Sequence, residues 1–321
     1  MMQSAWVGDN VYIHKTACRT NFSFKLSFYN IFWIILGLKE EDALIYHAQS
    51  SLPYLVFSKI FCFFLIKKNI FVYDVHDLHE DSNDESLYVK LRYLIFLWLE
   101  FFIFKIRSIR KMTVSRGLSC VISSKYRVEE PVVVYNCSVE CADYINALND
   151  RSESILFFGT KERFPIALLD VIQDSDMTLS FYGRGVNYEW LSEINKCYDR
   201  SLVNIYGEYS PDNLNFVSEY KVALNFFPEN NSLNFKYSLP NKLFQAIGMG
   251  TTVIVSENFH EMIDLFSEIK YAVVSATEDS FTDVVSDIVK NRTMEDAWSG
   301  VLKLRDIKNE SMDNYKKLVA R

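Results

Sequence analysis

The sequence contains little glycine and proline, and its cysteines follow no metal-binding or disulfide pattern. Ten glycines, six prolines and six cysteines occur among its 321 residues. The cysteines form no CxxC pair and accompany no spaced HxxxH motif, which argues against a zinc site or a disulfide framework. No Pro-rich or Gly/Ser-rich tract indicates a long disordered segment. The default expectation is a folded chain with reduced thiols.

The sequence also lacks the long apolar runs of a leader peptide or a membrane span. The first twenty residues have no basic start followed by a continuous apolar core. The most apolar run, Tyr93 to Phe104, is shorter than the roughly 20 residues that span a bilayer, and Glu100 interrupts it. We therefore predict a cytoplasmic protein without a transmembrane helix.

Charge is distributed unevenly along the chain. The formal net charge is -7, and residues 1–150 carry 16 basic and 16 acidic side chains, so the excess of acid lies in the second half. Within the neutral first half, the segment 101–128 has no acid and seven basic residues: Lys105, Arg107, Arg110, Lys111, Arg116, Lys125 and Arg127. The region Tyr93–Arg127 is therefore a predicted contact with an anionic membrane, at the inner face of the plasma membrane. The alternatives are a solvated basic face and helices that cover a parallel sheet.

Short apolar runs rich in Val, Ile, Tyr and Phe alternate with longer helical patterns, which predicts repeated βαβ units. In the first half, helices are expected between strands at Val11–His14, Ala43–His47, Ile70–Val75, Lys111–Ser115 and Val132–Tyr135. In the second half, strands are expected at Ile155–Phe158, Thr178–Tyr182, Leu202–Tyr206, Val222–Asn225, Thr252–Val255 and Ala272–Val274. We predict an α/β protein with two doubly wound domains, 1–150 and 151–305, and a C-terminal helix, 306–321, that packs back on the first domain.

Glycines mark the predicted ligand-facing edge of the second domain. Gly159, Gly183, Gly185 and Gly207 each fall at or just past the carboxyl end of a predicted strand. In open α/β sheets this edge faces the ligand, and a scarce residue without a side chain leaves room there.

The segment Ser238–Ser256, SLPNKLFQAIGMGTTVIVS, has the composition of a phosphate-binding loop, helix and strand. Pro240 suits the first turn of a helix, whose unpaired amides and positive dipole end attract phosphate. Lys242 adds a positive charge and Asn241 adds a neutral hydrogen-bonding group. The alternative is a helix-to-strand joint that binds no ligand.

Several motifs together resemble the GT-B glycosyltransferases, specifically the large retaining group known as family 4. In the second half they are ILFFG (155–159), LSFYGRG (179–185), VNIYGEY (203–209) and the segment Ser238–Ser256. In the first half they are VYDVHDLHE (72–80), MTVSRGLS (112–119) and VVVYN (132–136). The resemblance implies two Rossmann-like domains that face a cleft. It also implies retaining transfer of a sugar from a nucleotide-diphosphate donor to a glycan acceptor, which we expect to be lipid-linked, as in surface-polysaccharide assembly.

The resemblance assigns roles to residues at the matching positions. His76 corresponds to a catalytic histidine that contacts the transferred sugar. The remaining positions bind the donor: Lys161, Arg163, Asn241, Lys242 and Leu243 its diphosphate; Gln245, Gly207 and Tyr209 its ribose and base; and Gly159, Gly183 and Pro240 line its cleft. Neither a metal nor another cofactor is expected, because members of this group neutralise the leaving diphosphate with amides and basic side chains. Nucleic acid is not an expected partner.

The sequence departs from the family pattern in two places. Two glutamates eight positions apart usually bracket the central segment, and here they are replaced by Tyr237 and Gln245. The amide of Gln245 can still accept a ribose hydrogen bond, but without the charge of a carboxylate. The first domain also lacks the usual opening strand and glycine-rich loop, with Gly8 standing alone, so we expect a shortened domain or a chain that begins late.

Other functions remain open at this stage. The group His76, Asp77, His79, Glu80 and Asp81 could suggest a metal site, but no distant ligand is evident, so no metal is favoured. An inactive nucleotide-sugar-binding partner subunit is one alternative, based on Gln245 and Tyr237. A glycoside or phosphoester hydrolase is a weaker one, since Asp74, Asp77 and Glu80 are the one tight acidic group near a strand end.

Overall fold

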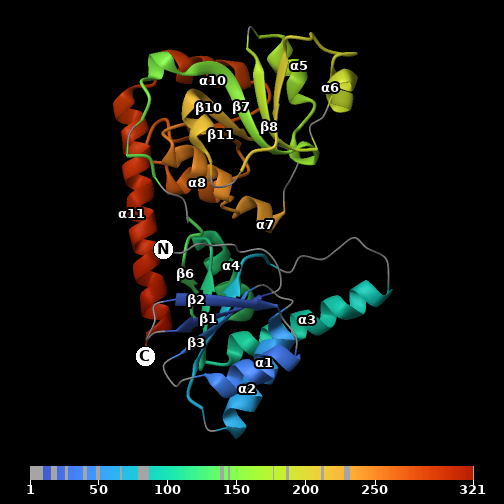
Figure 1. Cartoon of the computed structure of the whole chain (residues 1–321), viewed down its shortest axis with the longest axis vertical. Helices are drawn as coiled ribbons and strands as arrows, with labels where there is room; N and C mark the ends of the chain where they lie inside the picture. Colours follow the sequence, from blue (N-terminus) through green and yellow to red (C-terminus); the bar gives the residue numbers. More distant parts are fainter. Residues whose placement is uncertain are drawn as a thin grey trace. The chain divides into compact units, whose positions relative to one another are not determined.

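The computed structural model shows an α/β protein (Figure 1). It describes residues 10–15, 20–25, 28–38, 42–47, 51–65, 67–78, 87–137, 141–143, 145–175, 177–185, 188–210, 213–227 and 232–320. The predicted positions Gly8, His79, Glu80 and Asp81 lie outside these residues.

The chain forms two compact units and passes between them several times. The first unit comprises Met1–Tyr135, Ser232–Tyr237 and Asn309–Arg321, and the second comprises Asn136–Asn231 and Ser238–Lys308. The structure thus divides the chain at 135/136 and 308/309, whereas the sequence placed the divisions at 150/151 and 305/306. The short helix α7 (Leu233–Lys236) belongs to the first unit although its neighbours in sequence belong to the second.

The first unit contains a six-stranded sheet with the order β2-β1-β3-β4-β5-β6. Its strands are β1 (Asn10–Lys15), β2 (Thr20–Lys25), β3 (Ala43–His47), β4 (Ile70–Val75), β5 (Ile109–Thr113) and β6 (Val132–Val133). Strands β3 to β6 are parallel, and β1 is antiparallel to both β2 and β3. An antiparallel strand pair therefore extends the parallel sheet.

Two details of the first sheet differ from the prediction. Strand β2 lies where a helix was expected, although the alternation of Phe22 and Phe24 with polar residues in TNFSFK is the period of a strand. Strand β5 begins at Ile109, two residues before the predicted start, because the basic residues Arg110 and Lys111 obscure the apolar pattern.

Helices cover both faces of this sheet. On one face the core includes Leu44, Tyr46 and Tyr73 and residues from α1 (Phe28–Gly37), α2 (Leu52–Phe64), α3 (Leu87–Lys105) and α4 (Arg116–Tyr126). On the other face, Ala43 and Ile45 pack with Tyr315, Leu318 and Val319 of α11 (Met294–Val319). The alternation of strand residues between the faces produces these two cores.

The second unit has a fully parallel six-stranded sheet with the order β12-β11-β10-β7-β8-β9. Its strands are β7 (Ser152–Thr160), β8 (Leu179–Arg184), β9 (Val203–Gly207), β10 (Tyr220–Asn225), β11 (Thr252–Ser256) and β12 (Val273–Ala276). All six match predicted strands, because each is a short apolar run between helical patterns. The strand order reverses between β7 and β10, which makes this sheet doubly wound.

The helices of the second unit pack around this sheet. They are α5 (Leu168–Gln173), α6 (Tyr188–Ile194), α8 (Asn241–Gly248), α9 (His260–Leu265), α10 (Phe281–Asn291) and the first part of α11, with short 3-10 turns η2 (Leu148–Asp150), η3 (Lys161–Arg163) and η4 (Asn215–Glu219). Phe181, the most deeply buried aromatic of β8, lies in a core with residues of α5 and α10.

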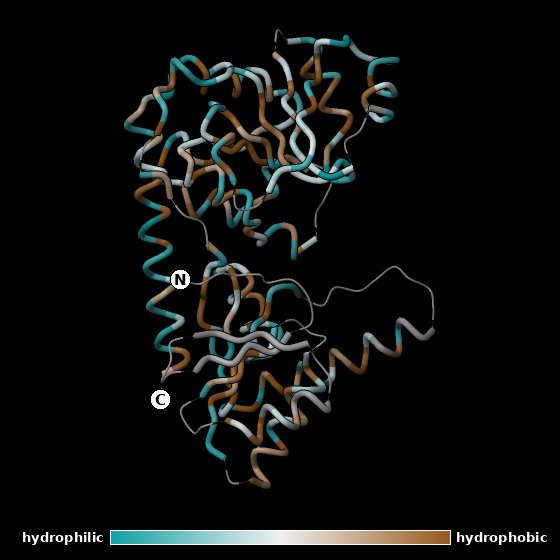
Figure 2. Tube along the Cα trace, in the orientation of Figure 1, coloured by the Kyte–Doolittle hydropathy of each residue, from teal (hydrophilic) through white to brown (hydrophobic). Residues whose placement is uncertain are grey.

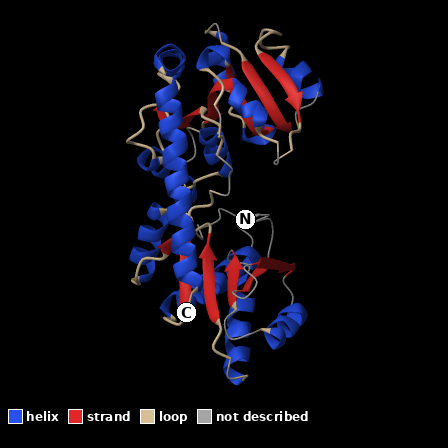
Figure 3. Ribbon diagram, turned by 60° about the vertical axis from the view of Figure 1, so that its left-hand side comes forward, coloured by secondary structure: helices blue, strands red, loops and turns tan. Residues whose placement is uncertain are grey.

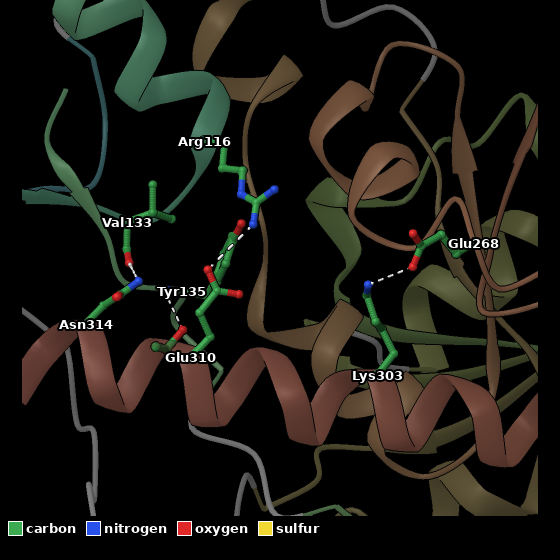
Figure 4. A network of polar contacts seen from close by, with 8 residues as sticks. Arg116, Val133, Tyr135, Glu268, Lys303, Glu310 and Asn314 are labelled. Carbon is green, nitrogen blue, oxygen red and sulfur yellow. Dashed lines mark hydrogen bonds and ion pairs between the residues drawn. The ribbon is translucent and has the colours of Figure 1, made fainter.

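Helix α11 is one continuous element that contributes to both units (Figure 3). In the second unit its Val301 packs on Ile145, and Lys303 pairs with Glu268 at 3.0 Å. Its last part is held to the first unit by polar contacts shown in Figure 4: Asn314 Nδ2 donates to the Val133 carbonyl at 3.0 Å, Ser311 Oγ accepts from the Tyr135 amide at 3.0 Å, and Glu310 pairs with Arg116 at 3.5 Å.

Among the residues that the structure describes, no helix combines the length and apolar character needed to cross a membrane.

Candidate functional site

The parallel pairing of β7 with β8 in the second unit brings two glycines together at the carboxyl edge of the sheet. Gly159 at the end of β7 is paired in register with Gly183 at the end of β8. Gly183 has a φ of +152°, and a Cβ atom there would clash with the carbonyl oxygen of Gly159. Gly183 therefore excludes a side chain, and with Gly159 beside it the sheet edge stays open where such folds bind ligands.

The side chain of Lys242 occupies the space over Gly159. A Cβ atom added to Gly159 would lie 2.5 Å from Lys242 Nζ. The contact joins the end of β7 to the first turn of α8, two segments that the sequence separates widely. It places a positive charge at the switch point of the sheet.

The first turn of α8 also presents unpaired backbone donors. Pro240 stands at the N-cap in an extended conformation, and the N–H of Leu243 donates to its carbonyl at 3.0 Å. Among the described residues, the amides of Asn241 and Lys242 donate to no backbone carbonyl. The Leu243 side chain is fully buried. Two amides and the positive end of the helix dipole are thus available to an anion.

Lys242 is a desolvated cation beside a second cation. Burial, together with the smaller effect of the Arg163 charge, lowers its pKa to about 8. Arg163 and Lys161 lie in η3, directly after β7. Within the described part of the chain, Lys242 has no acidic partner and no hydrogen bond, and its Nζ lies 6.0 Å from the Phe157 ring centroid. Such a group gains strongly from an anionic ligand.

The predicted base-binding residues follow β9 on the same edge. Gly207 ends β9 with a φ of +81°, and the ring of Tyr209 contacts Phe158 and Phe216 at centroid distances of 6.0 and 5.4 Å. Gln245 is half-buried on α8, three residues beyond Lys242. These residues therefore share one unit with the lysine and glycine cluster.

Tyr237, the other departure from the family pattern, is not part of the second unit. It belongs to the first unit, where its ring lies so close to Gly117 of α4 that a Cβ atom at Gly117 would clash with it. The neighbouring Asn234 is tied to Leu78 of the same unit by two hydrogen bonds, of 2.5 and 2.8 Å. In place of the expected carboxylate, this position carries a packing residue.

In the first unit, two histidines converge on one buried carboxylate. Asp74 in β4 is 1% exposed, and its Oδ2 lies 2.9 Å from His47 Nδ1 and 3.2 Å from His76 Nε2. His47 ends β3 in register with Asp74, and the two imidazole rings meet edge to face at 4.1 Å. The sequence predicted His76 but missed His47, although both follow apolar runs that end at the same edge of the sheet.

The charges in this cluster support one another. Burial favours the neutral form of Asp74, but the charge of His76 and hydrogen bonds from both histidines outweigh burial and lower its pKa to about 2. Burial also opposes the charged form of His76, yet the attraction of Asp74 outweighs it and raises the pKa of His76. Asp74 is therefore ionised and held in place, which leaves it poorly suited to act as a free acid or base.

Two residues of the predicted basic region, Arg110 and Lys111, make hydrogen bonds to backbone carbonyls within the first unit. Arg110 donates to the carbonyls of Lys317, Leu318 and Ala320, and so caps the C-terminus of α11. Lys111 donates to the Ile106 carbonyl at 2.6 Å, and burial lowers its pKa to about 8. Because their side chains are engaged in these hydrogen bonds, we no longer include these two residues in the predicted membrane contact.

Most exposed large apolar side chains of the first unit lie on or next to α1, α2 and α3. Helix α2 adjoins both α1 and α3, and Figure 2 shows many hydrophobic residues along these traces. Phe63 and Phe64 are 78% and 73% exposed, and Trp98 is 61% exposed. We call the following set the apolar face: Trp33, Leu36, Ile60, Phe63, Phe64, Leu65, Leu91, Leu94, Ile95, Trp98, Phe101 and Phe102. These exposed apolar side chains are concentrated on adjoining helices of one unit, whereas single scattered ones are normal on a protein surface.

No known protein family matches the chain, and no curated protein matches its sequence. Its structure is similar to TarM, with 12% identity and a TM-score of 0.58 over 94% of this chain and 59% of TarM. It is also similar to α,α-trehalose 6-phosphate synthase from Burkholderia multivorans, with 10% identity and a TM-score of 0.61 over 90% of this chain and 73% of that one.

A third similar structure is Anabaena HepE in complex with UDP, with 11% identity and a TM-score of 0.57 over 90% of this chain and 80% of HepE. The chain spans less than two thirds of TarM but larger shares of the other two. These similarities confirm the predicted GT-B fold of two Rossmann-like domains.

Proposed function

We propose that the protein is a glycosyltransferase that transfers a sugar from a nucleotide-diphosphate donor to a glycan acceptor. The observation that carries this proposal is the cation of Lys242, which lies over Gly159 beside Arg163 without an acidic partner in the described residues. A diphosphate supplies the missing negative charge. The structural neighbour HepE is named as a complex with UDP, which is consistent with such a ligand.

Transfer requires stabilisation of the negative charge that develops on the leaving diphosphate. Lys242, Arg163, Lys161 and the amides of Asn241 and Lys242 supply positive potential without a further group. Because these donors are fixed by β7, η3 and α8, little reorganisation accompanies the reaction. This step is proposed to be metal-independent and, by the family resemblance, to retain configuration at the sugar.

The remaining residues are proposed to orient the donor. Gln245 accepts a ribose hydroxyl through its amide oxygen, and Gly207 and Tyr209 contact the base. His76 contacts the transferred sugar, with its ring fixed by Asp74 at 3.2 Å. Pro240 and Gly183 shape the edge that the donor meets.

The acceptor is proposed to be lipid-linked and to be reached at an anionic membrane surface. The apolar face supports this, because the described side chains of α1, α2 and α3 include one acid, Glu100, which is 2% exposed. Lys90 and Lys105 are exposed on α3. An apolar surface with basic residues and no exposed acid suits insertion among anionic headgroups. The protein would then work at the inner face of the plasma membrane.

The test is nucleotide binding followed by transfer. UDP, GDP and ADP are titrated into the wild type, Lys242→Met and the control Lys290→Ala, which changes an exposed lysine of α10. We expect one diphosphate to bind the wild type and the control, and Lys242→Met to lose at least about tenfold in affinity. Equal nucleotide affinities in all three proteins would contradict the proposed diphosphate site at Lys242.

Sugar transfer is then assayed with the matching nucleotide sugars and lipid-linked acceptor extract. Binding without transfer or hydrolysis would favour an inactive partner subunit. Release of free sugar faster than transfer would favour a hydrolase.

A further inference from the structure

The pair of histidines around Asp74 is more than the proposed glycosyl transfer requires. Transfer as proposed uses one histidine at the sugar, whereas the structure brings His47 to the same carboxylate oxygen from the neighbouring strand. The three ligand atoms all lie within 4.8 Å of one another. Among the described residues, no other group of three His, Cys, Asp or Glu side chains meets this condition.

The donor set has the composition of a transition-metal site. Two imidazole nitrogens and one carboxylate oxygen suit Zn²⁺, Co²⁺ or Fe²⁺, whereas Mg²⁺ and Ca²⁺ prefer oxygen ligands. Neutral imidazoles and an ionised carboxylate are required, and binding would displace the protons now shared between them. Burial of Asp74, with His47 and His76 12% and 21% exposed, keeps the ligands largely away from competing water.

The separations of the two histidine nitrogens from Asp74 Oδ2 also suit a single ion. With metal–ligand bonds of about 2.0 to 2.2 Å, ligand separations of 2.9 and 3.2 Å correspond to angles of about 90° and about 100° at the ion. These are angles between adjacent positions of an octahedral or distorted tetrahedral ion. Each imidazole must tilt slightly so that its lone pair points to the ion instead of to Asp74 Oδ2.

The backbone fixes two of the three ligands. His47 and Asp74 are a register pair of the parallel strands β3 and β4, and His76 follows β4 directly. Three ligands from two paired strands need no loop to assemble. This rigidity favours a preformed site over one that appears only on binding.

We propose that His47, Asp74 and His76 bind one divalent transition-metal ion at the carboxyl edge of the first sheet. Three protein ligands leave at least one coordination position for water or a hydroxyl group, the pattern of an open site. The inference goes beyond the proposed function, whose diphosphate is held in the second unit without an ion. It corrects the premise that no distant ligand exists, because strand pairing supplies His47.

The test uses the full chain, freed of any histidine tag and treated with a chelator. Zn²⁺ and Co²⁺ are titrated separately into the wild type, His47→Gln, Asp74→Asn and the control His260→Gln, whose histidine begins α9 in the second unit. We expect one ion per wild-type and control chain. We expect each cluster variant to bind at least about tenfold more weakly. Absence of stoichiometric binding, or equal binding by His47→Gln, would overturn the proposal.

A second measurement, on the wild type alone, tests the site even if the variants fail to fold. X-ray absorption of the Zn²⁺-loaded wild type should show two imidazole ligands and oxygen donors, and a spectrum without imidazole would also overturn the site. UDP affinity measured in chelator is the matched readout for the proposed function. Loss of UDP binding with intact metal binding would reject the transferase site alone, and the reverse result would reject the metal site alone.

Discussion

Lys242 Nζ fills the space that a side chain at Gly159 would need, since a Cβ atom there would lie 2.5 Å from it. One residue belongs to the end of β7 and the other to the first turn of α8. The absence of a side chain at Gly159 thus leaves the Lys242 ammonium its position. The relationship couples the positions of the two residues, so a change at one should displace the other.

Gly159→Ala should therefore weaken UDP binding while leaving the stability of the fold nearly unchanged. The flexible end of Lys242 can move away from the new methyl group, so we expect an unfolding free energy within about 1 kcal/mol of the wild type. The displaced ammonium should weaken UDP binding about tenfold or more. Gly183→Ala is the contrasting variant, since its methyl group meets backbone at a φ of +152°, and strain of about 1–3 kcal/mol should lower stability. Denaturant unfolding and UDP titration distinguish them, and equal effects of both variants on stability would contradict the prediction.

The pKa of Lys242 predicts how nucleotide binding responds to pH. Because this pKa lies at about 8, below the ordinary 10.5, the ammonium is charged below pH 8 and loses its proton as pH rises. The protonation of Lys242 should therefore leave the affinity for UDP nearly constant from pH 6.5 to 7.5. Above pH 8 the affinity should fall by up to about tenfold per pH unit. Titration calorimetry across this range measures the effect. Lys242→Arg, which stays protonated, should bind without the loss, and a wild-type affinity that is flat to pH 10 would contradict the assignment.

The contribution of Lys242 to folding stability should change with pH in the opposite direction to the UDP affinity. Between pH 8 and 10.5 the unfolded lysine holds a proton that the folded one has lost, so the Lys242 contribution to stability rises with pH across that window. At pH 7, Lys242→Met removes a desolvated charge and should unfold at the same or higher denaturant concentration than the wild type. A clear loss of stability in this variant would show that the ammonium has a structural partner.

The apolar face predicts membrane binding that depends on two aromatic side chains. Phe63 and Phe64 end α2 and are the most exposed members of the face. Burying one such side chain contributes up to about 1.5–3 kcal/mol, so the double change to Ser should weaken binding to anionic vesicles at least about tenfold. Vesicle co-sedimentation at low and high salt measures this. Leu302→Ser, which alters a 53% exposed residue of α11 in the second unit, is the control and should bind normally.

A buried carboxylate in the first unit predicts a stability effect. Glu100 accepts hydrogen bonds from Tyr73 at 3.0 Å and from Tyr126 at 2.5 Å. Removing either hydroxyl leaves one carboxylate oxygen short of a donor, so Tyr73→Phe and Tyr126→Phe should each cost about 1–3 kcal/mol. Urea unfolding checks this, with the 55% exposed Tyr206→Phe as a control expected to change little. Additive losses in the double variant would indicate that the two hydroxyls act independently.

Local pattern was enough to predict much of the fold. All six strands of the second sheet were found because apolar runs and helical periods alternate cleanly there. Pro240, Asn241 and Lys242 marked a helix start, and Gly159 and Gly183 marked strand ends, because backbone and dipole requirements act over a few residues. In the first sheet β2 was missed, since its short alternation competed with the helices expected around it.

What the sequence by itself determined was therefore the series of strands and helices, the glycine-lined edge and the helix start that carries Lys242. Only the tertiary structure decided which side chains that are distant in the sequence lie in contact. The register of β3 on β4 joined His47 to Asp74, and the return of α7 to the first unit packed Tyr237 on Gly117. Such pairings depend on strand register and on long-range packing, which local composition does not encode.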